Sequence, residues 1–393
     1  MEQTGSQITL HVVAFNVPWP ADYGGVIDIY HRLSALHSAG VNIILHCFTY
    51  GRPEAPALQD CCERVYYYRR NMSPLLHLRT VPFIAASRDC ESLFRRLQQD
   101  GYPILIEGLH GCELLRRLRR QERAGQGRRC VVVRAHNVEQ QYYRSLAHSE
   151  RRLLRKIYLT VESYKLRRYE PVLLHADAVL AVTAEDALWF RRMGCSNVQT
   201  VAPFHPQPVT LPDTVHPDTG GDPYVLYHAD LSVPDNEWAV QWLLHHIAPK
   251  LSFRLVIAGR YPRSSLRRQI ARHANVMLVE SPSESAMTAL LRQARCTVLV
   301  TRQRTGFKLK LINTLYCGQH CLVNSDMVYG TGLASFCHVA DSPVQMLRLI
   351  QRLMQTPFSD ADRHLRRQRL AQHHDNAENA RQVINLINRV YCQ

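Results

Sequence analysis

The sequence predicts an α/β protein built from two doubly wound parallel sheets. Short apolar runs rich in valine and isoleucine alternate with helical segments, as expected when helices connect parallel strands. A polar, proline-rich stretch at 202–223 interrupts this alternation once, near the middle of the chain. With 393 residues, the chain is long enough for two domains that each bury a core.

The first half of the chain begins with a strand at 8–15, a helix at 26–40 and a strand at 41–49. Later strands in this half are expected at 103–108, 130–137 and 176–183, with helices between them. We therefore predict an N-terminal domain over residues 1–203 and a linker over 204–223, where prolines and polar residues gather.

The alternation restarts after the linker and predicts a second domain over 224–375. The expected strands lie at 224–229, 254–259, 276–280, 296–301, 320–325 and 335–340. The expected helices lie at 236–251, 264–274, 283–294 and 309–318. A last helix at 376–393 lies beyond the second sheet and could pack back on the N-terminal domain.

The composition is that of a folded protein of the cytoplasm. Hydrophobic residues make up 46% of the chain and charged residues 21%, which excludes wholesale disorder. No apolar run approaches the roughly 18 residues of a spanning helix, and we expect no signal peptide at the start. The twelve cysteines form no CxxC pair, which favours reduced thiols over a disulfide framework.

The formal net charge of +15 indicates a polyanionic partner: nucleic acid, an anionic membrane or a phosphate-bearing substrate. Arginines alternate with leucines at helical spacing in 114–129 and 150–168. Either segment is a solvated helix face or an amphipathic surface on anionic lipid, at the inner face of the plasma membrane. No zinc finger, RNP motif or basic zipper is present, so we expect no nucleic-acid partner.

Ligands of open α/β sheets bind beyond the carboxyl ends of the strands, near helix N-termini. The first such loop, NVPWPADYGG, carries Gly24 and Gly25 before the helix at 26–40. The pair either lets the backbone approach a ligand or forms a tight turn. It is not the dinucleotide fingerprint, since GxGxxG is missing.

A second candidate is RAHNVEQQYYRSL (134–146), where His136 follows an apolar strand. A histidine at this edge is a structural hydrogen-bonding residue or a catalytic one. Glu139 is either part of that site or a first-turn carboxylate stabilised by the helix dipole.

The third candidate is RTGFKLKLINTLYCGQHCLVNS (304–325), which runs from a strand end through a glycine loop into a helix and then a strand. Gly306 at the turn, the helix amides, Lys308 and Lys310 would form a diphosphate cradle without a metal ion. Asn313 could bind ribose hydroxyls. Arg260, after the strand at 254–259, is a second phosphate contact or a surface charge.

These segments resemble the family 4 type of GT-B glycosyltransferases, especially bacterial members from polysaccharide and glycoprotein assembly loci. The likeness spans nearly the whole chain. It rests on ADYGGVIDIYHRL, the HNxE-like RAHNVEQQYYRSL, YHADLSVPDNEWAVQWLL and VIAGRYP. Its most specific part is TGFKLKLINTLYCGQHCLVNS, which is similar to the family's GxGxKxKxLEAxxxGxPVV motif.

The resemblance implies two Rossmann-like domains with a cleft between them. Donor-binding residues would be Thr305, Gly306, Lys308, Lys310, Asn313 and Arg260, and residues on the acceptor and cleft side would be Tyr23, Gly24, Gly25, Asp28, His136 and Glu139. Members usually retain anomeric configuration and need no metal. This chain has Thr305 and Asn313 where the broad family carries two glutamates.

The predicted function is transfer of a sugar, expected to be a hexose, from a nucleotide-diphosphate sugar to a lipid-linked, polysaccharide or glycoprotein acceptor. Lys308 would stabilise the leaving diphosphate, and no cofactor or metal is expected. If the reaction inverts configuration, His136 or Asp28 would be the base. The only DxD, at Asp360 and Asp362, resembles a helix start rather than a metal site.

Two alternatives share the same architecture. A non-hydrolysing nucleotide-sugar epimerase would need acid and base carboxylates beside the sugar. A non-catalytic scaffold on a glycosyltransferase fold would account for the two replaced glutamates.

Overall fold

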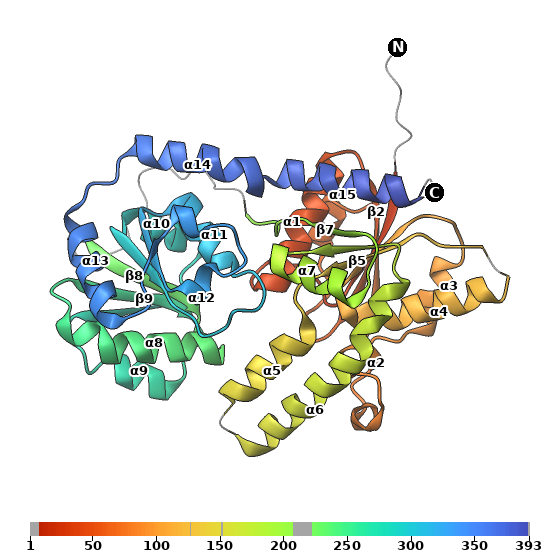
Figure 1. Ribbon diagram of the computed structural model, residues 1–393, viewed down its shortest axis with the longest axis horizontal. Coiled ribbons are helices and arrows are strands. Elements are labelled where there is room, and N and C mark those ends of the chain that lie inside the picture. Colours follow the sequence, from red (N-terminus) through yellow and green to blue (C-terminus); the bar gives the residue numbers. More distant parts are fainter. Residues whose placement is uncertain (1–7, 126, 151, 207–221, 392–393) are drawn as a thin grey trace, which may run out of the picture. The chain divides into compact units, whose positions relative to one another are not determined.

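The computed structural model describes residues 8–125, 127–150, 152–206 and 222–391 (Figure 1). The chain forms two compact units. The first comprises the chain up to 205 together with 305–307 and 374 onward, and the second comprises 206–304 and 308–373. Most of the predicted linker, 204–223, lies outside the described residues.

The first unit contains a parallel sheet with strand order β3-β2-β1-β4-β5-β6-β7. Its strands are β1 (Thr9–Ala14), β2 (Asn42–Thr49), β3 (Arg64–Arg69), β4 (Ile104–Glu107), β5 (Val131–Ala135), β6 (Ala178–Ala181) and β7 (Val198–Thr200). The order grows outward in both directions from β1, so the sheet is doubly wound.

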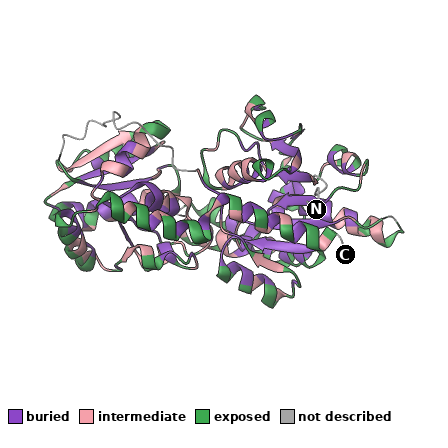
Figure 2. Cartoon of the chain, turned by 90° about the horizontal axis from the view of Figure 1, so that it is seen from above, coloured by how far each residue is buried: buried purple, intermediate pink, exposed green. Residues whose placement is uncertain are grey.

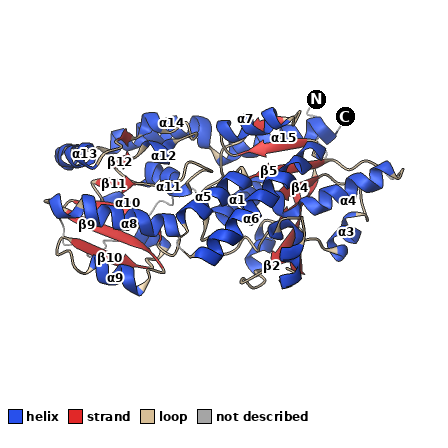
Figure 3. Ribbon diagram, turned by 60° about the horizontal axis from the view of Figure 1, so that its bottom comes forward, coloured by secondary structure: helices blue, strands red, loops and turns tan. Residues whose placement is uncertain are grey.

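Helices cover both faces of this sheet, as expected for parallel strands joined by crossovers (Figure 3). They are α1 (Gly24–Ser38), α2 (Phe83–Ala86), α3 (Glu91–Leu97), α4 (Cys112–Arg123), α5 (Glu139–Ser149), α6 (Leu153–Tyr169), α7 (Ala184–Met193) and α15 (Asn376–Tyr391), with short 3₁₀ turns η1 (Pro56–Asp60), η2 (Pro74–Leu78), η3 (Leu109–Gly111) and η4 (Glu170–His175). Figure 1 shows α5 and α6 lying side by side.

The second unit contains a parallel sheet of order β10-β9-β8-β11-β12-β13. Its strands are β8 (Tyr224–Asp230), β9 (Arg254–Arg260), β10 (Val276–Glu280), β11 (Cys296–Leu299), β12 (His320–Val323) and β13 (His338–Val339). Its helices are α8 (Pro234–His246), α9 (Ser264–Ile270), α10 (Glu284–Gln293), α11 (Leu309–Cys317), α12 (Ser325–Val328), α13 (Pro343–Gln355) and α14 (Asp360–His374), with 3₁₀ turns η5 (Ala248–Lys250) and η6 (Ala334–Phe336).

The central strands are buried on both faces, which explains their continuous apolar runs (Figure 2). In the first unit, α15 packs against α1 and adds four buried side chains to one face of the core, namely Ala380, Val383, Leu386 and Ile387. Burying an aliphatic side chain stabilises a fold by roughly 1.5–3 kcal/mol, so α15 is an integral part of the first unit.

The predicted α/β class with two doubly wound sheets is confirmed. Sequence reasoning missed β3, whose RVYYYR pattern is half-buried rather than apolar, and β7, a three-residue edge strand. The expected strand at 335–340 was wrong in extent, because 334–336 form a 3₁₀ turn and only His338–Val339 pair with β12. The aspartates at 360 and 362 do begin a helix, α14.

Candidate functional site

The carboxyl edge of the first unit's sheet carries a buried charged network around His136. Strand β4 ends at Glu107, and His136 directly follows β5. The Nε2 of His136 lies 3.0 Å from a carboxylate oxygen of Glu107, and its Nδ1 lies 3.5 Å from one of Asp28 on α1. Both ring nitrogens therefore face carboxylates, and the side chain is only 12% exposed.

Two buried arginines complete this network. Arg32, one helical turn after Asp28, donates to it at 2.8 Å and also pairs with Glu107. Arg134 lies 3.4 Å from Asp28 and donates to the carbonyl of Val201 at 2.7 Å. Burial alone would raise the pKa of Asp28, but the two guanidinium groups outweigh it and hold that pKa well below its usual range.

Because both oxygens of Asp28 accept hydrogen bonds inside the protein, one of them from the amide of Phe204 at 2.7 Å, this carboxylate holds other groups in place. Its 2% exposure leaves it no face for a substrate. Asp28, which the sequence analysis placed on the acceptor and cleft side, is thus buried against His136, Arg32 and Arg134.

The first loop lies beside this network. Tyr23 is the N-cap of α1, and its hydroxyl accepts a hydrogen bond from Asn16 at 3.2 Å. Gly24 begins the helix, and a Cβ on Gly25 would come within 2.8 Å of the Phe15 ring. Close packing therefore explains Gly25, and no described side chain caps the amides at the start of α1.

Glu139 begins α5 and is buried, with 5% of its surface exposed. Burial and then the neighbouring Glu170 raise the pKa of Glu139 to about 8, so the side chain is protonated at neutral pH. The structure therefore places Glu139 inside the first unit as a neutral acid. Glu139 does lie in the first turn of α5, as one of the two interpretations of the sequence had it, but its neutral form carries no charge for the helix dipole to stabilise.

His110 also lies at the carboxyl edge of the first unit's sheet. His110, which follows β4, stacks on the ring of Phe15 with 4.6 Å between ring centroids. Burial, followed by repulsion from Arg88 and His136, lowers the pKa of His110 well below its usual value. His110 is therefore neutral at physiological pH.

The loop before α11 follows the predicted course: 305–307 belong to the first unit, and the chain enters the second unit at Lys308. Gly306 has φ of +66°, in the left-handed region that favours glycine. Lys308 is the N-cap residue, and α11 begins at Leu309, as predicted. No acidic residue occupies the first turn of α11, so the positive end of the helix dipole is not neutralised locally.

Lys310 lies inside this unit, where its ammonium donates to the Oδ1 of Asn236 at 2.8 Å and sits 5.2 Å from the Tyr227 ring centre. Burial lowers the pKa of Lys310 to about 8. Asp235 opposes this shift and Lys308 adds to it. Positive charge from two lysines is thus concentrated at the start of α11.

The remaining predicted donor residues lie on different elements, because β9 and β11 are separated by β8 in the sheet. Thr305 and Gly306 form the loop, and Arg260 ends β9. Asn313 is half-buried and accepts a hydrogen bond from the thiol of Cys317 at 3.5 Å. The described contacts therefore bring Lys310 together with Lys308, whereas Asn313 is engaged within its own helix.

Sequence reasoning missed Glu107, Arg32 and Arg134 in the first unit, and Asp235 and Asn236 in the second. A signal did exist for two of them, since Glu107 is the last residue and Arg134 the next-to-last residue of an otherwise apolar strand. A charged residue in a buried strand requires a partner. Asp235 is anchored by the hydroxyl of Thr301 at 2.5 Å, a contact that no local pattern reveals.

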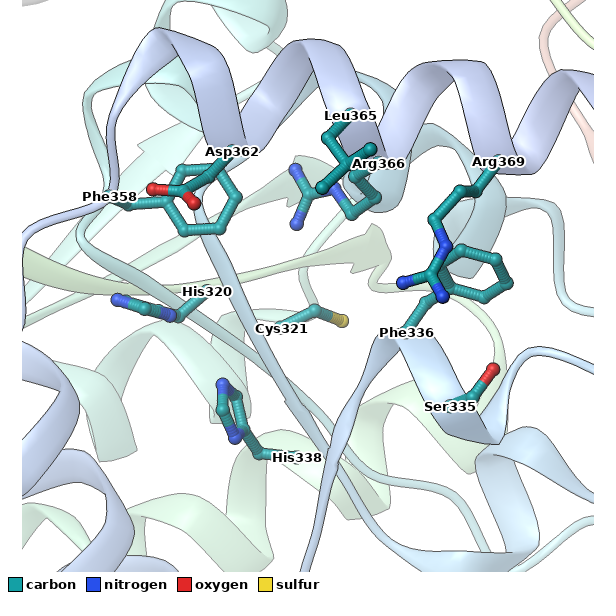
Figure 4. Close-up of a pocket in the computed structure, with 10 residues that line it drawn as sticks. All are labelled: His320, Cys321, Ser335, Phe336, His338, Phe358, Asp362, Leu365, Arg366 and Arg369. Carbon is teal, nitrogen blue, oxygen red and sulfur yellow. The ribbon is translucent and has the colours of Figure 1, made fainter.

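A separate pocket in the second unit lies between β12, β13 and α14 (Figure 4). His320 and His338, which line it, are the first residues of β12 and β13. The pocket therefore opens at the amino edge of the sheet, opposite the edge where α/β proteins bind ligands. We assign it no part in the candidate site.

Within the described ranges, no group of three or more His, Cys, Asp or Glu side chains is arranged to hold a metal ion. Across these same residues, no helix is both long and apolar enough to cross a bilayer. The cysteines that the structure describes are all free thiols.

The chain was compared with known proteins. No family model matches it. It is 23% identical over 346 residues to an uncharacterized 44.6 kDa protein in the cps region of Klebsiella pneumoniae, which covers 82% of this chain and 84% of that protein.

The solved structures define the fold. A sucrose-phosphate synthase from Thermosynechococcus elongatus matches with a TM-score of 0.68 and 17% identity, over 98% of this chain and 99% of that one. The lipopolysaccharide outer core galactosyltransferase WaaB matches with a TM-score of 0.65 and 12% identity, over 97% and 99%. A trehalose-6-phosphate synthase matches with a TM-score of 0.63 and 10% identity, over 98% and 99%. The fold is therefore GT-B, with two Rossmann-like domains, as predicted.

Proposed function

We propose that this protein is a glycosyltransferase that moves a sugar, a hexose by preference, from a nucleotide-diphosphate sugar to a glycan or lipid-linked acceptor. The observation that carries the proposal is the match of nearly the whole chain, both units included, to GT-B glycosyltransferases. The relative in a cps region supports an acceptor from polysaccharide assembly. We also propose that the protein is a GT-B glycosyltransferase of the family 4 type.

The start of α11 supports a diphosphate site. Lys308 and Lys310, the uncapped amides and the left-handed turn at Gly306 together provide positive charge and N–H donors. Cleavage of the sugar–phosphate bond builds negative charge on the departing diphosphate. Fixed donors at that place stabilise the transition state without any reorganisation.

In this mechanism Lys308 supplies the charge nearest the leaving group. Lys310 is held by Asn236 and contributes at longer range, because its ammonium is already hydrogen-bonded. No step requires a metal ion. A trehalose-6-phosphate synthase with the same fold transfers a glycosyl group with retention, and we propose the same stereochemical course here.

His136 is proposed to line the acceptor side. Its contacts with Glu107 and Asp28 fix the imidazole ring, so any group it offers to a substrate is oriented in advance. Both ring nitrogens already face carboxylates, which favours binding and electrostatic support over proton abstraction. This arrangement also favours retention, because Asp28 and His136 are poorly placed to act as a base.

A thermal-shift panel of UDP-, GDP- and dTDP-sugars tests the proposal. We expect at least one nucleotide to raise the melting temperature, and we expect Lys308→Ala to abolish that shift while Lys250→Ala, at an exposed position, keeps it. The absence of any shift in the wild type would favour a non-catalytic scaffold. A change in the donor sugar without acceptor would indicate an epimerase.

We further propose that the exposed side of α6 contacts an anionic membrane. Seven large apolar side chains on α6 and η2 are 47–84% exposed, namely Leu75, Leu78, Leu153, Leu154, Ile157, Val161 and Tyr164. Exposed basic residues, including Lys156 and Arg168, lie on the same helix. Lys165 ties α6 to η2 by donating to the carbonyl of His77 at 2.7 Å. Apolar insertion with surrounding positive charge is typical of peripheral membrane binding.

Flotation with vesicles tests this surface. The wild type should bind anionic vesicles at low salt, and Leu78→Glu with Leu154→Glu should remove binding without changing turnover on a soluble acceptor. Leu188→Glu, at a 47% exposed leucine on α7, is the matched control and should still bind. If the double variant binds the vesicles as well as the wild type does, membrane attachment depends on the net positive charge of the protein and not on the apolar side chains of α6 and η2.

A further inference from the structure

Two arginines at the carboxyl edge of the first unit's sheet are not accounted for by the network around His136. Arg88, in the loop after α2, is 7% exposed and donates from Nε to the carbonyl of Phe15 at 2.8 Å and from Nη1 to that of Ile84 at 2.8 Å. Phe15 directly follows β1, so this guanidinium is fastened to the end of the central strand.

Arg70 directly follows β3 and lies in the same cluster. Its Nε donates to the hydroxyl of Ser87 at 2.9 Å, and its guanidinium lies 4.7 Å from the ring centre of Tyr50 and 5.0 Å from that of Phe83. Its two terminal nitrogens make no hydrogen bond to another described residue. Stacking on the two rings therefore fixes the orientation of the guanidinium, and the N–H groups of its terminal nitrogens are available to a ligand.

Neither arginine forms an ion pair with a carboxylate in the part of the chain that the structure describes. The groups that favour the charged form of Arg88 are the hydroxyls of Tyr143, Tyr23 and Tyr50, and Arg70 disfavours it. Burial lowers the pKa of Arg70, and Tyr50, Tyr143 and Tyr158 oppose that shift. Burial lowers the pKa of Arg88 to about 9, so the guanidinium is still charged at neutral pH.

This arrangement is the opposite of a structural ion-pair network. A buried guanidinium without a carboxylate is costly, and a second one nearby adds repulsion. Such a pair is stabilised when an anion of matching charge joins it. Planar guanidinium groups donate in pairs to phosphate oxygens, and tyrosine hydroxyls donate to the same oxygens.

We propose that Arg70 and Arg88, with Tyr50 and Tyr143 at their rim, form a phosphate-binding subsite for the acceptor. The inference rests on the proposed glycosyltransferase activity and narrows its acceptor to one that carries a phosphoryl group. That group belongs either to a soluble sugar phosphate or to a lipid phosphate, and the chemistry of recognition is the same for both.

The test is a calorimetric titration of the full chain with inorganic phosphate. Saturating UDP is present so that the donor site is filled. Titration with chloride at matched ionic strength is the control. Arg70→Gln and Arg88→Gln should weaken phosphate binding at least about tenfold, since each loses charged hydrogen bonds. Arg69→Gln removes the same charge from the adjacent exposed residue and should leave binding unchanged.

Phosphate that binds no better than chloride, or equally in Arg70→Gln and Arg69→Gln, would overturn the subsite. Arg88 is buried, so if its variant fails to fold, Arg70→Gln decides alone. Glucose 6-phosphate and a polyprenyl diphosphate in detergent distinguish the two sources by which one competes with phosphate. Should UDP not bind at all, the proposed donor site fails, and the same titration without UDP still tests the arginines.

Discussion

The network around His136 and the start of α11 treat positive charge differently. In the first unit, Arg32 and Arg134 are buried against Asp28 and Glu107, so that each guanidinium has a carboxylate within the protein. In the second unit, the ammonium of Lys310 is held by the neutral amide of Asn236. Internal pairing fixes geometry, whereas a cation held by a neutral partner keeps its charge for a ligand.

The largest expected effect comes from breaking the paired network. Asp28→Asn would leave Arg134 without its carboxylate, so we expect the free energy of unfolding to fall by about 3–5 kcal/mol at pH 7. Urea denaturation followed by circular dichroism measures it. Asp360→Asn, which breaks an exposed pair with Arg363, should change little.

The same variant has a pH signature. The pKa of Asp28 is lower in the folded than in the unfolded chain, so its stabilising contribution is complete above about pH 4 and is lost as pH falls further. The difference between wild type and Asp28→Asn should therefore narrow in acid. A constant difference from pH 7 to pH 3 would contradict the charged role.

A slightly smaller effect is expected at the start of α11. Lys308→Ala should lower kcat by on the order of 10²–10³ without loss of stability, because the lysine acts on charge that develops during the reaction. Initial rates with a donor found in the thermal-shift panel measure this. The control variant Lys250→Ala should retain full turnover. If Lys308→Ala is fully active, Lys308 does not stabilise the leaving diphosphate.

Glu139 sharpens the comparison, because it is a buried acid without a cation. Its pKa of about 8 means that stability falls as pH rises from about 4.5 to 8 and then levels off. Glu139→Gln should abolish this fall, so that the stability of the variant relative to wild type increases by about 4 kcal/mol between pH 5 and pH 8.5. Urea denaturation at both values is the measurement, and the exposed Glu185→Gln should behave as wild type.

The smallest effect concerns Lys310. Because burial lowers its pKa to about 8, the ammonium loses its charge as pH rises from 7 to 9, and the affinity for UDP should fall about tenfold. Calorimetric titration in Lys310→Met should show weaker binding at pH 7 and little further decline. Parallel pH slopes in the two proteins would show that another group titrates.

The local sequence pattern predicted the secondary-structure elements better than it predicted the tertiary contacts. Apolar runs identified nine strands that are mostly buried, because a strand buried on both faces has no polar alternation to obscure it. The half-buried RVYYYR of β3 lacks that signal and was missed. By contrast, the sequence predicted the glycine loop and the start of α11, because turns and helix starts depend on residues that are close together in the chain.

Sequence alone determined the two-sheet α/β fold, the loop at Gly306 and the helix that begins at Leu309, because each depends on residues close together in the chain. Only the tertiary structure decided which charges meet. Asp28 and Arg134 lie 106 residues apart, and Arg88 reaches Phe15 across 73. Such pairs depend on strand order and burial, and no local spacing encodes these.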